Sequence, residues 1–175
     1  MAQLSRDSSP GLRQLSSIGR ARTGLPVPQA LLYGALAVGT LDILDAFIFF
    51  GLRGARPIRI LQSIAAGLLG REAFNGGWGT AALGLALHFF IAFIIVLVFV
   101  TASQRMPALT RQPVLVGLIY GIAVYLVMTF VVVPASAAGG GGLPRWPVAL
   151  NGVLIHLFGV GVPASLAGSA AARVR

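Results

Sequence analysis

Four long apolar runs most constrain what this 175-residue chain can fold into. They cover residues 29–52, 80–103, 113–133 and 148–171. A helix rises 1.5 Å per residue, so about 20 apolar residues cross a hydrocarbon core of about 30 Å. The runs therefore predict an all-α integral membrane protein, a four-helix bundle whose main partner is the lipid bilayer.

Composition supports this class of protein and excludes others. The chain is 57% hydrophobic and only 10% charged, whereas soluble domains are about 25% charged. Its net charge is +9, but the arginines lie in the tail and loops, where lipid headgroups account for them. No basic stripe with interleaved aromatic residues is present, so we expect no nucleic-acid partner. The absence of cysteine excludes disulfides, thiolate metal sites, iron–sulfur clusters and covalently attached haem.

Two segments outside the runs have a distinct composition. Residues 1–28 are rich in arginine and serine and predict a disordered tail ahead of a membrane domain at 29–172. The segment "PIRILQSIAAGLLG" (57–70) is too short to span, and its helical wheel separates an apolar half from a more polar half. We expect a short amphipathic helix in the membrane interface; the alternative is a re-entrant segment packed into the bundle. The two halves are Ile58, Ile60, Leu61, Ile64, Ala65, Leu68 and Leu69, against Arg59, Gln62, Ser63, Ala66, Gly67 and Gly70.

The distribution of arginines predicts the orientation. Eight lie on the side shared by both termini and the second loop, and five lie on the other side. The positive-inside rule then places both termini in the cytoplasm. Arg53, Arg56 and Arg59 follow the first run closely and work against this orientation.

A weak internal repeat relates the second and fourth runs. "WGTAALGLALHFF" (78–90) and "WPVALNGVLIHLF" (146–158) share five identities at an offset of 68 residues. The dipeptide "YG" also occurs at 33–34 and at 120–121, in similar places in the first and third runs. The repeat predicts two similar helical hairpins related by an axis along the membrane normal.

The repeat also predicts the depth of two histidines. Trp78 and Trp146 begin the two runs and are candidate interfacial anchors. His88 and His156 follow ten residues later, about 15 Å into the bilayer and near its midplane. Gly84 and Gly152 lie one turn earlier on the same faces, where a neighbouring helix or a flat ligand can approach the backbone.

The first run contributes two carboxylates. Asp42 and Asp45 are three residues apart and share a helix face. A stripe of small residues predicts that this face meets other helices: Ala35, Gly39, Asp42 and Ala46. Asp42 falls at the depth of the two histidines, and a charge there costs about 2.5–3.5 kcal/mol or more unless it is paired or protonated. Tyr125 and Thr129 are expected as hydrogen-bonding neighbours.

Four interpretations of this polar set remain open. It can be a structural cluster whose interhelical hydrogen bonds hold the helices together. It can also be a proton or ion relay of Asp42, Asp45, His88 and His156. It can also be a b-type haem site with His88 and His156 as axial ligands, or a metal site of all four residues. A relay in so small a bundle favours a homo-oligomer, for which Gly117 and Gly121 offer a GxxxG face. No hydrolase motif is present, and we do not expect an enzyme.

Residues 32–136 resemble a group of small bacterial inner-membrane proteins of unknown function. The resemblance is most specific in "LQSIAAGLLG" and "LGLALHFFIAF". It implies a four-span protein of a bacterial inner membrane. It implies no activity, cofactor or site residue.

Overall fold

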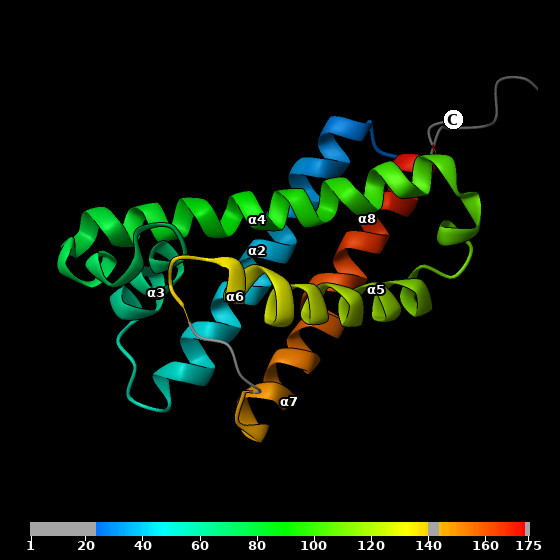
Figure 1. Cartoon of the computed structure of the whole chain (residues 1–175). Coiled ribbons are helices and arrows are strands. Elements are labelled where there is room, and N and C mark those ends of the chain that lie inside the picture. The colour runs from blue at the N-terminus through cyan, green and yellow to red at the C-terminus, as the bar shows by residue number, and fades with distance from the viewer. Residues whose placement is uncertain (1–23, 140–143, 174–175) are drawn as a thin grey trace, which may run out of the picture.

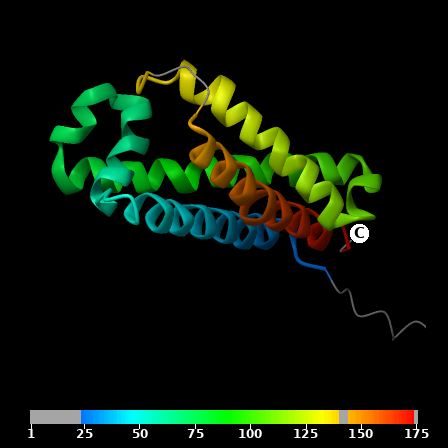
Figure 2. The same ribbon diagram turned by 90° about the horizontal axis from the view of Figure 1, so that it is seen from below.

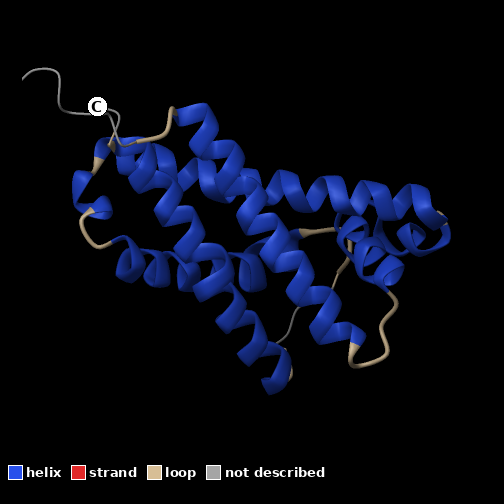
Figure 3. Ribbon diagram, turned by 180° about the vertical axis from the view of Figure 1, so that it is seen from behind, coloured by secondary structure: helices blue, strands red, loops and turns tan. Residues whose placement is uncertain are grey.

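A computed structural model describes residues 24–139 and 144–173 and contains only helices, turns and loops within them (Figure 3). Four helical stretches are long and apolar enough to cross a membrane, which confirms the predicted multi-pass helical protein. Spans one and two are α2 (Val27–Gly51) and α4 (Gly77–Arg105). Span three joins α5 (Pro113–Val127), the π-helical turn η3 (Met128–Val132) and α6 (Val133–Ala135). Span four joins α7 (Trp146–Ile155), the π-helical η4 (His156–Gly161) and α8 (Val162–Ala172).

The first span begins earlier than the sequence suggests. Helix α2 starts at Val27, inside the segment that we assigned to the tail. Proline suits the first turn of a helix because its missing N–H has no partner there, and Pro28 occupies that turn in α2. Residues 1–23 of the predicted tail lie outside the described residues. So do residues 140–143, in the loop between α6 and α7.

Two prolines explain why spans three and four are not α-helical throughout. A proline within a helix removes the hydrogen bond to the carbonyl four residues earlier and pushes that carbonyl away. For Pro134 and Pro163 these carbonyls belong to Phe130 and Gly159, which lie inside η3 and η4. Each span widens locally into a π-helical turn just before its proline, as often happens at such breaks.

The half of the bundle that contains the start of α2 and the end of α8 is closely packed. Its core consists of alanines, valines and one phenylalanine: Ala30, Val38, Ala92, Val96, Phe99, Val100, Val124, Val160, Ala164, Ala167 and Ala171. The Leu25 amide donates to the Ala170 carbonyl at 3.0 Å, which holds the start of α2 beside the end of α8. The Tyr120 hydroxyl donates to the Ile95 carbonyl at 2.7 Å and joins α5 to α4. Figure 1 shows α2, α4 and α8 crossing in this half.

The other half is filled by α3 (Pro57–Leu69) and the 3-10 turn η1 (Gly70–Asn75). Figure 2 shows α3 at the end of the bundle opposite the end of α8. A Cβ on Gly84 would overlap the Leu61 carbonyl, so α3 and α4 meet backbone to backbone. The Ala137 amide donates to the Gly67 carbonyl at 2.9 Å, which ties the end of span three to α3 as well.

The face of α3 that packs on the bundle combines residues from both halves of its helical wheel. Gln62 and Ala66, both from the more polar half, are buried against the start of α4 with Ile60 and Ala65. The Gln62 amide donates to the Gly77 carbonyl at 3.0 Å. Leu68 and Leu69, from the apolar half, are exposed. The helix exists at the predicted place, and its position in a membrane interface stays a prediction.

The GxxxG face of span three is used inside the chain. A Cβ on Gly117 would overlap the backbone at Val162, and a Cβ on Gly121 would overlap the His156 carbonyl. These glycines therefore let α5 pack against η4 and α8. Span four therefore covers the two glycines within the chain, and a homo-oligomer of this protein stays a prediction.

Candidate intramembrane polar site

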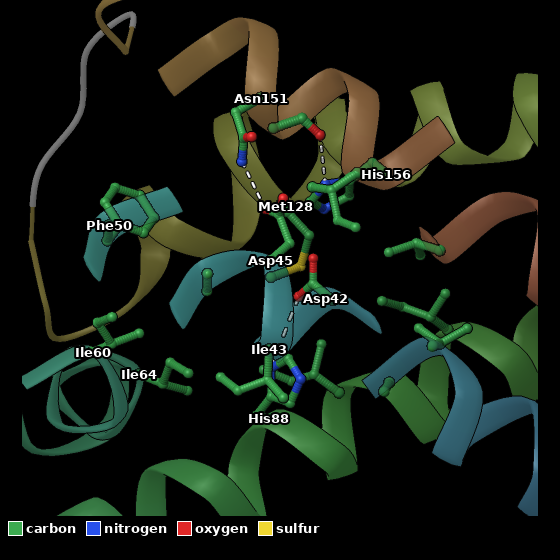
Figure 4. A pocket seen from close by; sticks show the side chains of 18 of the residues that line it. Asp42, Ile43, Asp45, Phe50, Ile60, Ile64, His88, Met128, Asn151 and His156 are labelled. Atoms are coloured by element: carbon green, nitrogen blue, oxygen red, sulfur yellow. Dashed lines mark hydrogen bonds and ion pairs between the residues drawn. The ribbon is translucent and has the colours of Figure 1, made fainter. Parts of the chain in front are cut away.

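A cavity of about 290 Å³ lies where the closely packed half meets the half filled by α3. Its walls are mainly aliphatic, and polar groups converge in it from three spans and from α3. Figure 4 shows these groups gathered around Asp42. The polar residues at its wall are Asp42, Asp45, Ser63, His88, Asn151 and His156.

His88 reaches the cavity from α4 and is held by the backbone of α2. Its Nε2 lies 2.8 Å from the Gly39 carbonyl oxygen. A carbonyl only accepts, so Nε2 carries the hydrogen and donates. Nδ1 lies 4.0 Å from Oδ2 of Asp42. The His88 side chain is 11% exposed and that of Asp42 is 30% exposed, so the carboxylate is the more accessible of the two.

His156 reaches the cavity from the first turn of η4. Its Nδ1 lies 2.8 Å from the Gly152 carbonyl oxygen one turn earlier, so Nδ1 carries the hydrogen. The Tyr125 ring packs edge-on against the imidazole with the centroids 5.6 Å apart. Nε2 of His156 makes no hydrogen bond with the described residues.

The two aspartates have different partners. In Figure 4 the Asp42 side chain lies between His88 and His156, and it interacts electrostatically with both. It accepts no hydrogen bond from the residues that the structure describes. Asp45 accepts a hydrogen bond of 2.6 Å from Asn151 Nδ2, which joins α2 to α7. Asp42 and Asp45 share one helix face but have different partners: the two histidines for Asp42, and Asn151 for Asp45.

The structure brings the four predicted site residues to one cavity, and adds one that the sequence analysis missed. Asn151 is the amide in span four, and a polar amide inside an apolar run is a signal for an interhelical contact. Tyr125 lies beside His156 as expected, through its ring. Thr129 forms no hydrogen bond with a site residue in the described part of the chain.

The predicted anchors lie at helix ends. Trp78 and Trp146 are the second residue of α4 and the first of α7, and are 78% and 76% exposed. Large apolar side chains face outward elsewhere as well, as lipid contact requires, among them Ile48, Phe90, Ile119 and Phe158. Anchoring by the two tryptophans stays a prediction.

The geometry does not fit a haem held by both histidines. Axial ligands approach one iron from opposite faces of a flat macrocycle. The Asp42 carboxylate lies in the space between the two imidazoles, where the iron and the macrocycle would have to lie (Figure 4). We therefore derive no chemistry from haem.

The described residues do not assemble the four side chains as a metal site. Within residues 24–139 and 144–173, no group of three or more His, Asp or Glu side chains is placed to hold a metal ion. Asp45 is turned toward Asn151, and His88 Nε2 is committed to the Gly39 carbonyl.

Comparisons with known proteins give no further guide to the site. No family model, curated protein or solved structure matches this chain.

Proposed function

We propose that this membrane protein translocates protons, and that Asp42, His88 and His156 form its intramembrane proton-binding site. One observation carries the proposal. A carboxylate lies between two imidazoles, each held by a backbone carbonyl through one nitrogen, and the other nitrogen of each imidazole makes no hydrogen bond with the described residues. Carboxylates and imidazoles inside membrane bundles are the usual materials of proton relays.

The surroundings of the site support one-sided access. The cavity extends from Asp42 toward α3 and the start of α7, where Phe50, Ser63 and Val148 line it. Toward the termini, Val96, Val100 and Val160 are almost completely buried in the core. A proton would enter from the end of the bundle that carries α3.

Release on the other side requires the packed half to rearrange. The interface of α8 with α4 and α2 is built from small residues, which permit packed helices to slide by small shear movements. Ala164, Ala167, Gly168 and Ala171 supply this interface. Alternating access would then follow from displacement of α8 about the site rather than from unfolding of a span.

The test is proton flux into proteoliposomes. Purified protein is reconstituted into phosphatidylcholine–phosphatidylglycerol vesicles that contain the pH dye pyranine, and a potassium gradient with valinomycin drives proton entry. We expect flux above that of protein-free vesicles, and at least a tenfold loss in Asp42→Asn. Glu72→Gln, which removes an exposed carboxylate in η1 outside the cavity, is the matched control and should retain the flux. Flux equal to that of empty vesicles would overturn the proposal.

A second candidate is favoured by the hydrogen bonds across helices. His88 to Gly39 joins α4 to α2, and Asn151 to Asp45 joins α7 to α2. Such contacts fix helix register and contribute about 0.6–2 kcal/mol each. A purely structural cluster predicts that Asp45→Asn and Asn151→Ala lower the unfolding temperature in detergent and that wild-type vesicles conduct no protons.

A further inference from the structure

We propose that the cavity around Asp42 binds a small protonated amine, in competition with the proton. The inference rests on the proposed function insofar as it assigns a substrate class to the same site. The first observation is the volume of the cavity. A proton needs no cavity, whereas about 290 Å³ is close to the lower end of pockets that enclose small molecules.

Charge selects a cation. Two carboxylates line the cavity, and no arginine or lysine does among the described residues. Two arginines of the α2–α3 segment have other partners. Arg53 donates to the Phe49 carbonyl at 2.7 Å and lies over the Phe49 ring, and Arg59 donates to the Phe74 carbonyl at 2.9 Å. An anion would meet unscreened carboxylates in a medium of low dielectric constant, so anionic ligands are disfavoured.

Hydrogen bonding selects a donor. Asp42 accepts no hydrogen bond from the described residues, and the unbound nitrogens of His88 and His156 are acceptors whenever the imidazoles are neutral. An ammonium group brings several N–H donors to these acceptors and supplies the positive charge that Asp42 requires. Since no three-ligand metal group is present in residues 24–139 and 144–173, an organic cation fits better than a metal ion.

The walls select an apolar body. Ile43, Ile91, Ile95 and Met128 surround the polar centre, and the Phe50 ring lies at the edge toward α3 (Figure 4). Aliphatic walls favour a hydrocarbon or aromatic substituent, and an aromatic ring adds attraction for a cation that passes it. The complementary ligand is a compact primary amine with a hydrophobic substituent.

The test compares two probes of similar size by isothermal titration calorimetry of the full protein in detergent. The probes are 2-phenylethylamine, protonated at neutral pH, and the neutral alcohol 3-phenylpropan-1-ol. We expect the amine to bind at least tenfold more tightly than the alcohol. The binding enthalpy should depend on the ionisation enthalpy of the buffer, because protons leave the site. Equal affinities would overturn the inference, since they indicate only partition into an apolar cavity.

Variants locate the binding. Asp42→Asn should weaken amine binding at least tenfold, and Glu72→Gln should not change it. Ile91→Trp fills the cavity while keeping every carboxylate, and it should also abolish binding. Unchanged binding in a folded Asp42→Asn or Ile91→Trp protein would place the amine elsewhere and overturn the inference. Proton flux without amine binding would leave the proposed function standing, whereas amine binding without flux would remove the proposed function alone.

Discussion

At the scale of single residues, Gly84 decides how closely α3 approaches α4. Its added Cβ would overlap the Leu61 carbonyl, whereas a Cβ on Gly79, in the same helix, would meet nothing within 4 Å. We expect Gly84→Ala to lower the free energy of unfolding in detergent by about 1–3 kcal/mol, the usual cost of overpacking.

Gly79→Ala is the matched control for this change. It introduces the same methyl group into open space and should leave stability unchanged or raise it by up to about 1 kcal/mol, because alanine favours helix. Reversible unfolding in detergent, followed by circular dichroism, measures both variants. Equal stability of the two proteins would contradict the backbone contact between α3 and α4.

Residue patterns predicted part of the site. The spacing of ten residues from each tryptophan placed His88 and His156 at one depth, and counting back along span one placed Asp42 there. Spacing along a helix does not specify rotation about the helix axis. For that reason the contact of Asp45 with Asn151, and the commitment of His88 to the Gly39 carbonyl, could not be read from the sequence.

At the scale of elements, Gln62 holds α3 in place. Its side chain is 2% exposed, and its amide donates to the Gly77 carbonyl and, at 3.4 Å, to the Thr80 hydroxyl. Gln62→Leu leaves the Gly77 carbonyl without this donor, so we expect a loss of about 1–3 kcal/mol. Amide hydrogen exchange should accelerate over residues 57–80.

Gln112→Leu makes the same substitution at an exposed position at the start of α5. It should change neither the stability nor the exchange rates of residues 57–80. If exchange in α3 stayed as slow in Gln62→Leu as in this control, Gln62 would not be the contact that holds the element.

Hydropathy predicted the four spans to within a few residues, because length and apolar content suffice to define them. It predicted less about α3. A helical wheel separates two halves of the helix but does not specify which residues meet α4; in α3, Gln62 and Ala66 of the more polar half pack there, and Leu68 and Leu69 face outward. The π-helical turns were not predicted, since Pro163 signals a break and not the form that it takes.

At the scale of the whole molecule, the chain has no cysteine, so its orientation can be tested with single cysteines. Arg56 lies in the loop before α3, and Gln112 lies in the loop before α5, on the opposite side of the bundle. The arginine distribution predicts that Gln112 lies in the cytoplasm. We expect a membrane-impermeant maleimide to label Arg56→Cys in intact bacterial cells, and Gln112→Cys only after permeabilisation. The reverse pattern would invert the orientation, and labelling of both in intact cells would contradict a four-span protein.

The position of the cavity also has an electrical consequence. Under the proposed function, the site is reached from the end that carries α3, and the valine core lies on its other side. A cation that stops at Asp42 therefore crosses part of the voltage difference between the two compartments. A full crossing corresponds to about 2.3 kcal/mol per 100 mV, so about half of it changes occupancy roughly sevenfold. With the predicted orientation, a negative cytoplasm draws cations into the site. The apparent affinity of the site for a cation then reports the membrane potential of the cell.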